Sequence, residues 1–289
     1  MRAAGFNATF EYNACLLQSR ALTPRPLMNP FTAALQDWST SARLVPLWSN
    51  LALEDLRDRY RRTVLGLAWI VASFALFVAV KVFVFGQLTN VSAEEFGVYV
   101  TLGFGLWTYI NAMVVDACTA YMHSRPWILG TSTPYPVFLL QAVFRNWLIF
   151  GMILLVMAIA LAWKTTPWTM VSLSVVPALL VYALTSLWLA AILAPLCARY
   201  RDLFHTVQTS MRLIFFATPI LWIPATSGRL MLLAQLNPIS HFVAIVRDPL
   251  MYNRLPATSW WVVLAINALG LAAGIVVYAM TRRRIAHWV

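Results

Sequence analysis

Long, uninterrupted apolar segments recur along this 289-residue chain and dictate its fold class. A helix that spans a lipid bilayer needs roughly 20 consecutive, mostly apolar residues. Six segments meet this requirement: 64–88, 96–117, 137–163, 168–195, 203–223 and 260–280. Membrane β-barrels use shorter segments of alternating polarity, and these runs do not alternate. The sequence therefore predicts an all-α integral membrane protein with six transmembrane helices.

The positions of the basic residues along the chain are those expected of a membrane protein. The formal net charge is +11, yet only 11% of the residues are charged, which is low for a soluble protein. If both termini are cytoplasmic, the inner flanks of the spans collect most of the basic residues, as the positive-inside rule requires. These are Arg57, Arg59, Arg61, Arg62, Arg125, Arg199, Arg201, Arg282, Arg283 and Arg284. The outer segments hold Lys164, Arg229, Arg247 and Arg254. We expect these basic residues to contact membrane lipids, and we do not expect the chain to bind nucleic acid.

The chain divides into three parts. Residues 1–30 lack an apolar signal segment and contain several prolines, so we expect a flexible cytoplasmic tail. Residues 31–63 are expected to form a cytoplasmic interface segment with one amphipathic helix. Residues 64–289 are expected to form the six-span transmembrane domain.

The amphipathic helix is predicted to begin near Pro46, because proline is tolerated in the first turn of a helix. Ala52, Leu56 and Tyr60 recur at helical spacing and give the helix a narrow apolar stripe. No linker separates its charged end from the first apolar run. We therefore expect a charged helix in the cytoplasmic interface that runs directly into the first span.

The polar face of this helix allows two interpretations. Asp55–Arg59 and Asp58–Arg62 are acid-before-base pairs four residues apart, a spacing that supports a helix. The helix is either a simple topology anchor or a docking surface for another protein. Docking is favoured by acidic residues such as Glu54 and Asp58, which lipid headgroups do not require.

Two segments between the predicted spans are long enough to hold structure of their own. The cytoplasmic segment 119–136 is expected to contain one short helix. The outer segment 224–259 is unusually apolar, and its pieces 227–236 and 238–251 have helical patterns but are too short to span. We expect two re-entrant or interfacial helices on the outer face, separated at Asn237 and Pro238.

The sequence contains no recognisable catalytic set. The four histidines are scattered, the three cysteines lack metal-ligand spacing, and no GxSxG or HExxH motif occurs. A GxxxxGKS/T phosphate-binding loop is also absent. We therefore expect no enzyme activity, cofactor or metal in this chain. If it moves cargo uphill, another chain must hydrolyse the nucleotide.

Charged residues inside the predicted spans are candidates for function, because burying them in lipid is costly. They are Lys81, Asp116, Arg145 and Arg212. Snorkelling or pairing within one helix is the simpler interpretation for the first three. Arg212 lies near the middle of the fifth predicted span, where its guanidinium could face a cavity and bind a phosphate through paired hydrogen bonds. An Asp116–Arg212 ion pair is the alternative.

Aromatic residues are frequent in the predicted spans. Trp69, Trp107, Phe215 and Phe216 could line a channel, because aromatic faces stack on sugar rings. With Arg212 and Asp116 they form the candidate substrate path. Lipid contact or core packing is the alternative for each aromatic residue.

Three stretches together resemble the permease subunits of ABC-2 type transporters that export O-antigen, capsule and related polysaccharides. DLRDRYRRTVLGLAW at 55–69 is similar to the entry into the first span of these permeases. RYRDLFHTVQTSMRLIFFATPILW at 199–222 resembles their loop and fifth span, and LNPISHFVAIVRDPLMYN at 236–253 resembles their outer gate. The resemblance extends over about residues 47–284.

The resemblance implies a protein of the bacterial inner membrane with cytoplasmic termini. It implies a homodimer that binds two ATP-binding cassette subunits and exports a lipid-linked polysaccharide. ATP and Mg would bind the partner subunits. Two alternatives remain open: an ABC permease for drugs or small lipids, which lacks a continuous aromatic path, and a membrane enzyme or scaffold without an ATPase partner.

The resemblance also implies roles for particular residues. Tyr60, Arg61 and Arg62 would border the ATPase-docking surface, and residues 123–129 would form the coupling loop. Within that loop the docking candidates are His123, Arg125 and Trp127. A rigid charged helix fused to the first span would carry ATPase movement into the membrane.

Two further regions are assigned by the same resemblance. Arg199, Arg201 and Asp202 would anchor the start of the fifth span, and Pro219 would end its regular part. The candidate residues of the outer gate are Pro238, His241 and Arg247.

Overall fold

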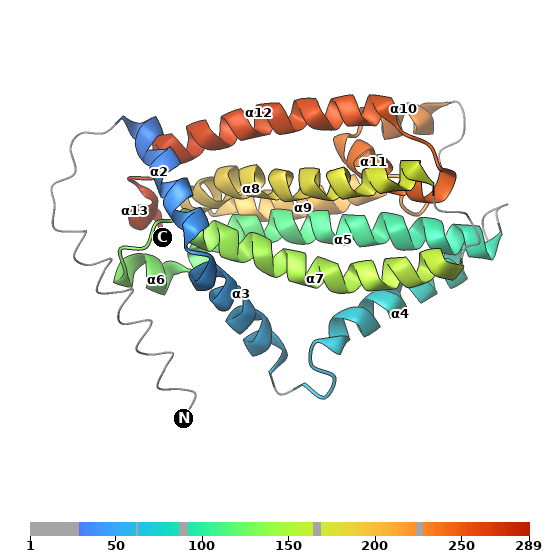
Figure 1. Ribbon diagram of the computed structural model, residues 1–289, viewed down its shortest axis with the longest axis horizontal. Coiled ribbons are helices and arrows are strands. Elements are labelled where there is room, and N and C mark those ends of the chain that lie inside the picture. The colour runs from blue at the N-terminus through green and yellow to red at the C-terminus, as the bar shows by residue number, and fades with distance from the viewer. Residues whose placement is uncertain (1–28, 62, 87–91, 164–168, 224–227) are drawn as a thin grey trace.

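The computed structural model describes residues 29–61, 63–86, 92–163, 169–223 and 228–289. Within these ranges the chain folds into α-helices, one short 3₁₀ helix and connecting turns, with no β-strand. The long helices lie side by side in one elongated bundle (Figure 1). The all-α membrane fold predicted from the sequence is confirmed.

Five helices in the described ranges are long and apolar enough to cross a membrane. They are α4 (Ala68–Gly86), α5 (Ala93–His123), α7 (Pro136–Trp163), α8 (Val175–Arg199) and α12 (Ala257–Thr281). A 3₁₀ turn, η1 (Met170–Ser174), precedes α8. These helices correspond to five of the six predicted spans. The second extends beyond its predicted end because apolar side chains continue to His123.

The remaining predicted span, 203–223, is shorter than expected. Helix α9 covers Asp202–Ala217, and its 16 residues extend over only about 24 Å, less than the ~30 Å hydrocarbon core. The helix ends at Thr218, immediately before Pro219, as the sequence predicts. The expectation that Pro219 ends the regular part of this span is met, and residues 218–223 of the predicted span are not helical.

The two short outer helices occur where the sequence places them. Helix α10 covers Arg229–Leu236 and α11 covers Pro238–Tyr252, with a bend of 90° between them. Pro238 is the first residue of α11, and the Asn237 side chain caps that helix by accepting from the Ile239 N–H at 3.0 Å. If this bent pair is counted as one broken span, the number of candidate spans rises to six.

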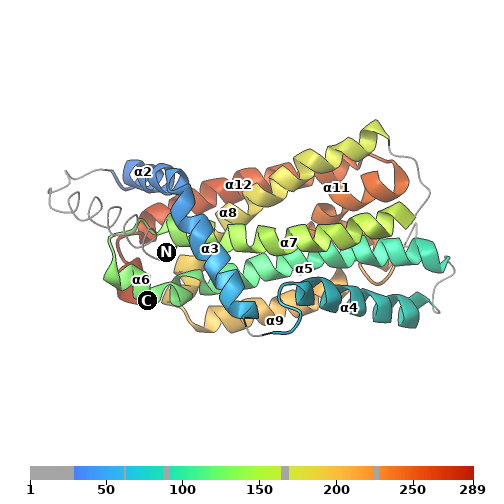
Figure 2. The same ribbon diagram turned by 60° about the horizontal axis from the view of Figure 1, so that its bottom comes forward.

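The short elements gather at opposite ends of the bundle. Helices α2 (Pro30–Arg43), α6 (Arg125–Gly130) and α13 (Ile285–Trp288) lie at one end, and α10 and α11 lie toward the other (Figures 1 and 2). Helix α3 (Val45–Tyr60) crosses the side of the bundle obliquely near the first end. This arrangement is the one expected if both termini lie on the same side of the membrane.

Helix α2 was not expected from the sequence, because its flanking prolines argue against a helix. Pro30 occupies the first turn of α2, where proline's missing N–H is tolerated, and the Asn29 side chain accepts from Phe31 N–H at 3.1 Å. The interface segment therefore holds two helices, α2 and α3, joined at Leu44.

Helix α3 does not continue into the first span, so the predicted fusion is wrong. It ends at Tyr60, and α4 begins at Ala68. The Thr63 hydroxyl donates to the Tyr60 carbonyl at 2.9 Å, which satisfies one of the last free carbonyls of α3. Gly66 then adopts a φ of 53°, which glycine tolerates best. The chain bends sharply between the two helices (Figure 1).

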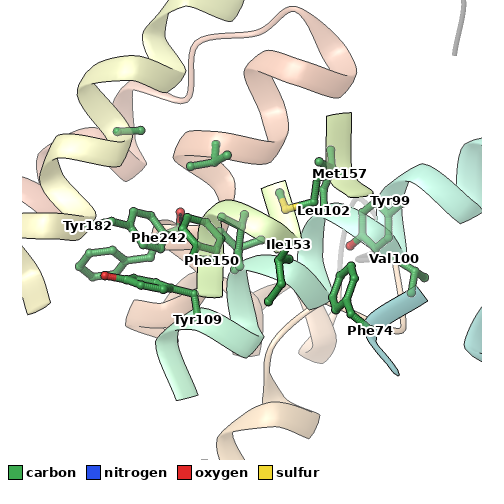
Figure 3. Packing of buried hydrophobic residues seen from close by; sticks show 14 of the residues in the cluster. Phe74, Tyr99, Val100, Leu102, Tyr109, Phe150, Ile153, Met157, Tyr182 and Phe242 are labelled. Atoms are coloured by element: carbon green, nitrogen blue, oxygen red, sulfur yellow. Dashed lines mark hydrogen bonds between the residues drawn. The ribbon is translucent and has the colours of Figure 1, made fainter. Parts of the chain in front are cut away.

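Helix α5 is the centre of the bundle. It packs against α4, α7, α8 and α9, and its side chains supply much of the hydrophobic core. An aromatic group built on Tyr109, Phe150, Tyr182 and Phe242 connects α5, α7, α8 and α11 (Figure 3). The Tyr109 and Phe150 ring centroids are 4.5 Å apart, and the Tyr182 hydroxyl donates to the Phe242 carbonyl at 2.9 Å. Both tyrosine hydroxyls of this group therefore have a partner, since the Tyr109 hydroxyl lies 2.6 Å from the Ser186 hydroxyl.

Candidate functional site

Helix α9 presents a polar face that the rest of the chain does not cover. Its residue Met211 packs against α5 through a small hydrophobic cluster. The opposite face is exposed and mixes polar side chains with the apolar Leu213 and Phe216, which are 69% and 71% exposed. The polar members are His205, Thr206, Thr209, Ser210 and Arg212. These polar side chains suit water, a polar ligand or a second protein better than they suit lipid tails.

Arg212 does not pair with Asp116. Its side chain is exposed, and no ion pair or hydrogen bond of Arg212 occurs within the described ranges. The Asp116 carboxylate instead accepts from Arg145 at 2.8 Å. The Asp116–Arg212 alternative from the sequence is therefore wrong, and Arg212 is available to an external anion.

Three of the four predicted path aromatics belong to one group. The Trp107 and Phe215 ring centroids are 5.3 Å apart, and those of Phe215 and Phe216 are 5.4 Å apart. Trp107 is buried, whereas Phe216 is 71% exposed on the outer face of α9. Trp69 on α4 is half exposed and makes no ring contact in the described part of the chain.

The charged amine of Lys81 also contacts this aromatic group. The Lys81 Nζ lies 3.0 Å from the centroid of the Phe104 ring, and Phe104 in turn contacts Phe215 edge-on at 6.3 Å. A cation over an aromatic face is stabilised by the ring quadrupole. Lys81 is thus held by aromatic contacts between α4 and α5, an arrangement that the simple snorkelling interpretation does not include.

A second polar cluster lies between α3, α5 and α7, and the sequence did not reveal it. Arg145 on α7 donates from Nη1 to Asp55 on α3 and from Nη2 to Asp116 on α5, both at 2.8 Å. Gln141 donates to the same Asp55 oxygen at 2.7 Å, and Asn146 donates to the same Asp116 oxygen at 3.0 Å. The predicted Asp55–Arg59 pair is replaced by this long-range pairing.

The charged docking candidates at α3 are exposed, whereas Tyr60 packs against the hydrophobic core. Glu54 and Asp58 are exposed, Tyr60 is half-buried, and Arg61 lies 4.0 Å from Asp58 in a solvent-exposed pair. The predicted partner of Asp58 was Arg62, which falls outside the described residues. The buried residues of α3 are Ala52 and Leu56, so the predicted apolar stripe is confirmed.

The candidate coupling loop forms a short helix at the end of the bundle. Helix α6 directly follows α5, with Ser124 between them, and begins with Arg125 and Pro126. His123 and Arg125 are exposed, Trp127 is 38% exposed, and Ile128 is buried against the bundle. The prediction of one short helix in this loop is confirmed, and its polar side chains are presented at the surface.

His241 connects the two short outer helices to α12. Its Nδ1 lies 3.0 Å from the Ser259 hydroxyl at the start of α12, and its Nε2 lies 2.9 Å from the Gln235 carbonyl in α10. The Gln235 carbonyl can only accept, so Nε2 carries the proton in this arrangement. His241 therefore fixes the angle between α10, α11 and α12.

Arg247 holds the chain where α9 ends. It is buried, donates from Nη1 to the Pro219 carbonyl at 2.7 Å, and lies over the Tyr99 ring at 4.2 Å. The Tyr99 hydroxyl is within hydrogen-bond distance of the carbonyls of Pro219 at 2.9 Å and Trp222 at 3.0 Å. The candidate gate residue Arg247 is thus a structural clamp between α11, α5 and the turn after α9.

The described residues offer no site for a metal, since no group of His, Cys, Asp or Glu is arranged to hold one. The arrangement provides exposed polar side chains on α9, an aromatic group beside them and exposed charged elements at one end of the bundle.

Comparison with known proteins identifies relatives of this chain. No family model matches it. It is 28% identical over 213 residues to the O-antigen export system permease protein RfbA of Myxococcus xanthus, covering 72% of this chain and 81% of that protein. It is 25% identical over 208 residues to the protein of the same name from Klebsiella pneumoniae, covering 70% and 79%. The resemblance to O-antigen export permeases that the sequence motifs predict is confirmed.

Proposed function

Because the chain resembles O-antigen export permeases of the ABC-2 type, we propose that it is the transmembrane subunit of an ATP-driven exporter. Its cargo is a lipid-linked polysaccharide, which it moves across the bacterial inner membrane. Two copies form the channel, and two ATP-binding cassette subunits bind and hydrolyse ATP with Mg on the cytoplasmic side. Both termini of the permease are cytoplasmic.

The uncovered polar face of α9 carries this proposal. Its Thr209, Ser210 and Arg212 are exposed in the middle of α9, and lipid tails would offer these side chains no hydrogen bonds. A second copy of the chain facing this surface would enclose a polar passage. The bundle of a single chain has a packed aromatic and aliphatic core around α5, which leaves no comparable space within it.

The chemistry of the face fits a glycan attached to lipid through phosphate. Arg212 is exposed and supplies a planar guanidinium, which binds phosphate oxygens through paired hydrogen bonds. Phe216 is exposed one turn further along α9 and offers a ring face to a sugar. Together they support an anionic lipid-linked glycan as the cargo.

The exposed elements at one end of the bundle support docking of an ATPase. Helix α3 presents Glu54 and Asp58, and α6 presents His123 and Arg125. Both signs of charge are available, so a partner with a complementary surface can bind in one orientation.

The first experiment is affinity purification of the tagged chain in mild detergent, followed by mass spectrometry and an ATPase assay. We expect a stoichiometric ATP-binding cassette subunit with ATPase activity. Recovery of a clean single chain without activity, in several detergents, would exclude the exporter and favour a membrane enzyme or scaffold.

The role of Arg212 is tested by Arg212→Ala in cells that depend on this exporter. We expect export to fall roughly tenfold, the effect of about 1.5 kcal/mol for one lost charge-assisted hydrogen bond, with assembly intact. Arg212→Lys retains the charge and should be less affected, and Arg254→Ala changes an exposed arginine outside α9 as a control. Normal export in Arg212→Ala would remove Arg212 from the path.

A further inference from the structure

Helix α3 is attached to the bundle through α7 and not through α4. The segment between α3 and α4 contains no helix and turns at Gly66, so movement of α3 along its axis is not passed directly to α4. Along α7, in contrast, α3 makes a continuous contact. The Trp48 ring packs edge-on against Phe144 at 5.2 Å, and further along the same contact Asp55 meets Arg145.

Arg145 bridges two helices at once. Its two terminal nitrogens bind different carboxylates, Asp55 on α3 and Asp116 on α5, each at 2.8 Å. Its side chain is only 9% exposed, compared with 19% for Asp116 and 42% for Asp55. The cation is therefore buried within the bundle, and Asp55 approaches it from the surface.

Both carboxylates are fixed by a second donor. Gln141, one turn before Arg145 on α7, donates to Asp55, and Asn146 donates to Asp116. The Asn146 amide is itself oriented by the carbonyl of Ala142 at 3.0 Å. Every residue of this network has at least one partner, although the Nε of Arg145 is buried without one. Displacing a member would leave further polar groups unsatisfied, which makes the network rigid.

Separating α3 from α7 would strip Asp55 from a guanidinium that water reaches poorly. Leaving a buried charge without one of its partners is strongly unfavourable. Displacement of α3 therefore tends to carry α7 with it, and through Asp116 it carries α5. Three helices respond together although the covalent chain between α3 and α4 is bent.

We propose that Asp55, Arg145 and Asp116 form the link through which movement of a docked ATPase on α3 reaches the spans α5 and α7. This inference rests on the proposed export function. The three residues are positioning residues: they touch neither cargo nor nucleotide, and they transmit displacement from one helix to the next.

The test uses the full complex of this chain with its ATP-binding subunits, and it measures both ATP hydrolysis and export. Asp55→Asn keeps the shape of the side chain but removes its charge. Arg145→Lys keeps the charge, but one ammonium cannot bind two carboxylates at opposite ends as a guanidinium does. We expect each variant to assemble and hydrolyse ATP within about twofold of the unmodified complex, and to lose at least about fivefold in export per ATP hydrolysed.

Matched controls separate this role from a general loss of charge. Glu94→Gln removes an exposed carboxylate from α5, and Arg43→Lys changes an exposed arginine on α2. Both should export normally. Asp55→Glu retains the carboxylate and should recover most of the export that Asp55→Asn loses.

Two results would overturn the inference. In the first, Asp55→Asn and Arg145→Lys export as much per ATP as the unmodified complex. In the second, export falls only in proportion to the amount of assembled complex, which would indicate a purely structural role. Failure of the proposed function is recognised separately, because the unmodified chain would then show neither an ATPase partner nor export, and the inference would fall with it.

Discussion

Gly270 and Gly274 on α12 allow the Trp188 ring of α8 to lie directly against a helix backbone. A Cβ atom at Gly270 would overlap the ring, and one at Gly274 would lie 3.2 Å from the Trp188 Cβ. The Trp188 indole N–H donates to Asn267 at 3.0 Å, which fixes the ring in this position. Small residues at such contacts let membrane helices approach closely and gain packing energy.

Substitution of Gly270 by alanine should therefore destabilise the protein. The added methyl group must displace Trp188 or separate α8 from α12, at a cost of about 1–3 kcal/mol. The measurement is thermal unfolding of the purified protein in detergent. Gly151→Ala on α7 is the matched control, because a Cβ at Gly151 meets no neighbouring atom. Equal unfolding temperatures for the two variants would contradict the packing argument.

The partners of charged residues were the part of the candidate site least accessible from the sequence. Apolar context identifies Asp116 and Arg145 as unusual, because a charge inside a span is costly. Their pairing depends on how α5 and α7 pack, and the third member, Asp55, is 90 positions away from Arg145. Local rules such as the four-residue spacing suggested Arg59 for Asp55, and tertiary packing overrode them.

At the level of helices, α2 is held to the end of α12 by a compact polar contact. Asp37 accepts from Arg282 at 2.8 and 2.6 Å and from the Tyr278 hydroxyl at 3.1 Å. Both ionic side chains are only 14% exposed, and the Trp38 ring packs edge-on against Tyr278. The first described helix is thereby joined to the end of α12.

Asp37→Asn should release α2 from the bundle. An amide retains at most part of the contact with Arg282, so we expect a loss of about 2 kcal/mol, typical for a hydrogen bond to a charged group. Limited proteolysis in detergent reports this release as faster cleavage near Leu44. Arg283→Gln, which changes a neighbouring exposed arginine, should leave the cleavage rate unchanged. Identical digestion of both variants would argue against the clamp.

Helix positions were largely predictable, and helix ends were not. Long apolar runs predict α4, α5, α7, α8 and α12 because only a helix satisfies the backbone inside lipid. The end of α9 was predictable from Pro219, which cannot continue a helix. The bend at Gly66 was missed because helical spacing of apolar residues continues across it, and the left-handed conformation of a single glycine leaves no periodic signal.

At the level of the whole molecule, exposed apolar side chains cover most of the bundle, and the outer face of α9 departs from this pattern. Leu155 and Ile159 on α7 are more than 60% exposed, as expected for side chains that meet lipid. Thr206, Thr209 and Arg212 on α9 are also exposed but are polar. Among the long stretches of the bundle, the exposed side of α9 thus adds polar groups to the apolar Leu213 and Phe216.

Water should reach the face of α9 and not that of α7. In a background in which the three native cysteines are replaced by alanine, Thr209→Cys should react with a charged, membrane-impermeant maleimide in native membranes. Ile159→Cys, at a position 66% exposed on α7, should stay unlabelled because lipid tails exclude the reagent. The measurement is the labelled fraction by mass shift, and equal labelling at both positions would rule out a polar passage along α9.

The turn at Gly66 has a further consequence for α4. Only 17% of its apolar stretch is buried within the chain, compared with 67% for α5. Because α3 does not brace α4 end to end, α4 is fastened chiefly by its contacts with α5 and α7. Tilting α4 outward would uncover few side chains. Among the five long helices, α4 is therefore the one whose movement away from the bundle exposes the least buried surface.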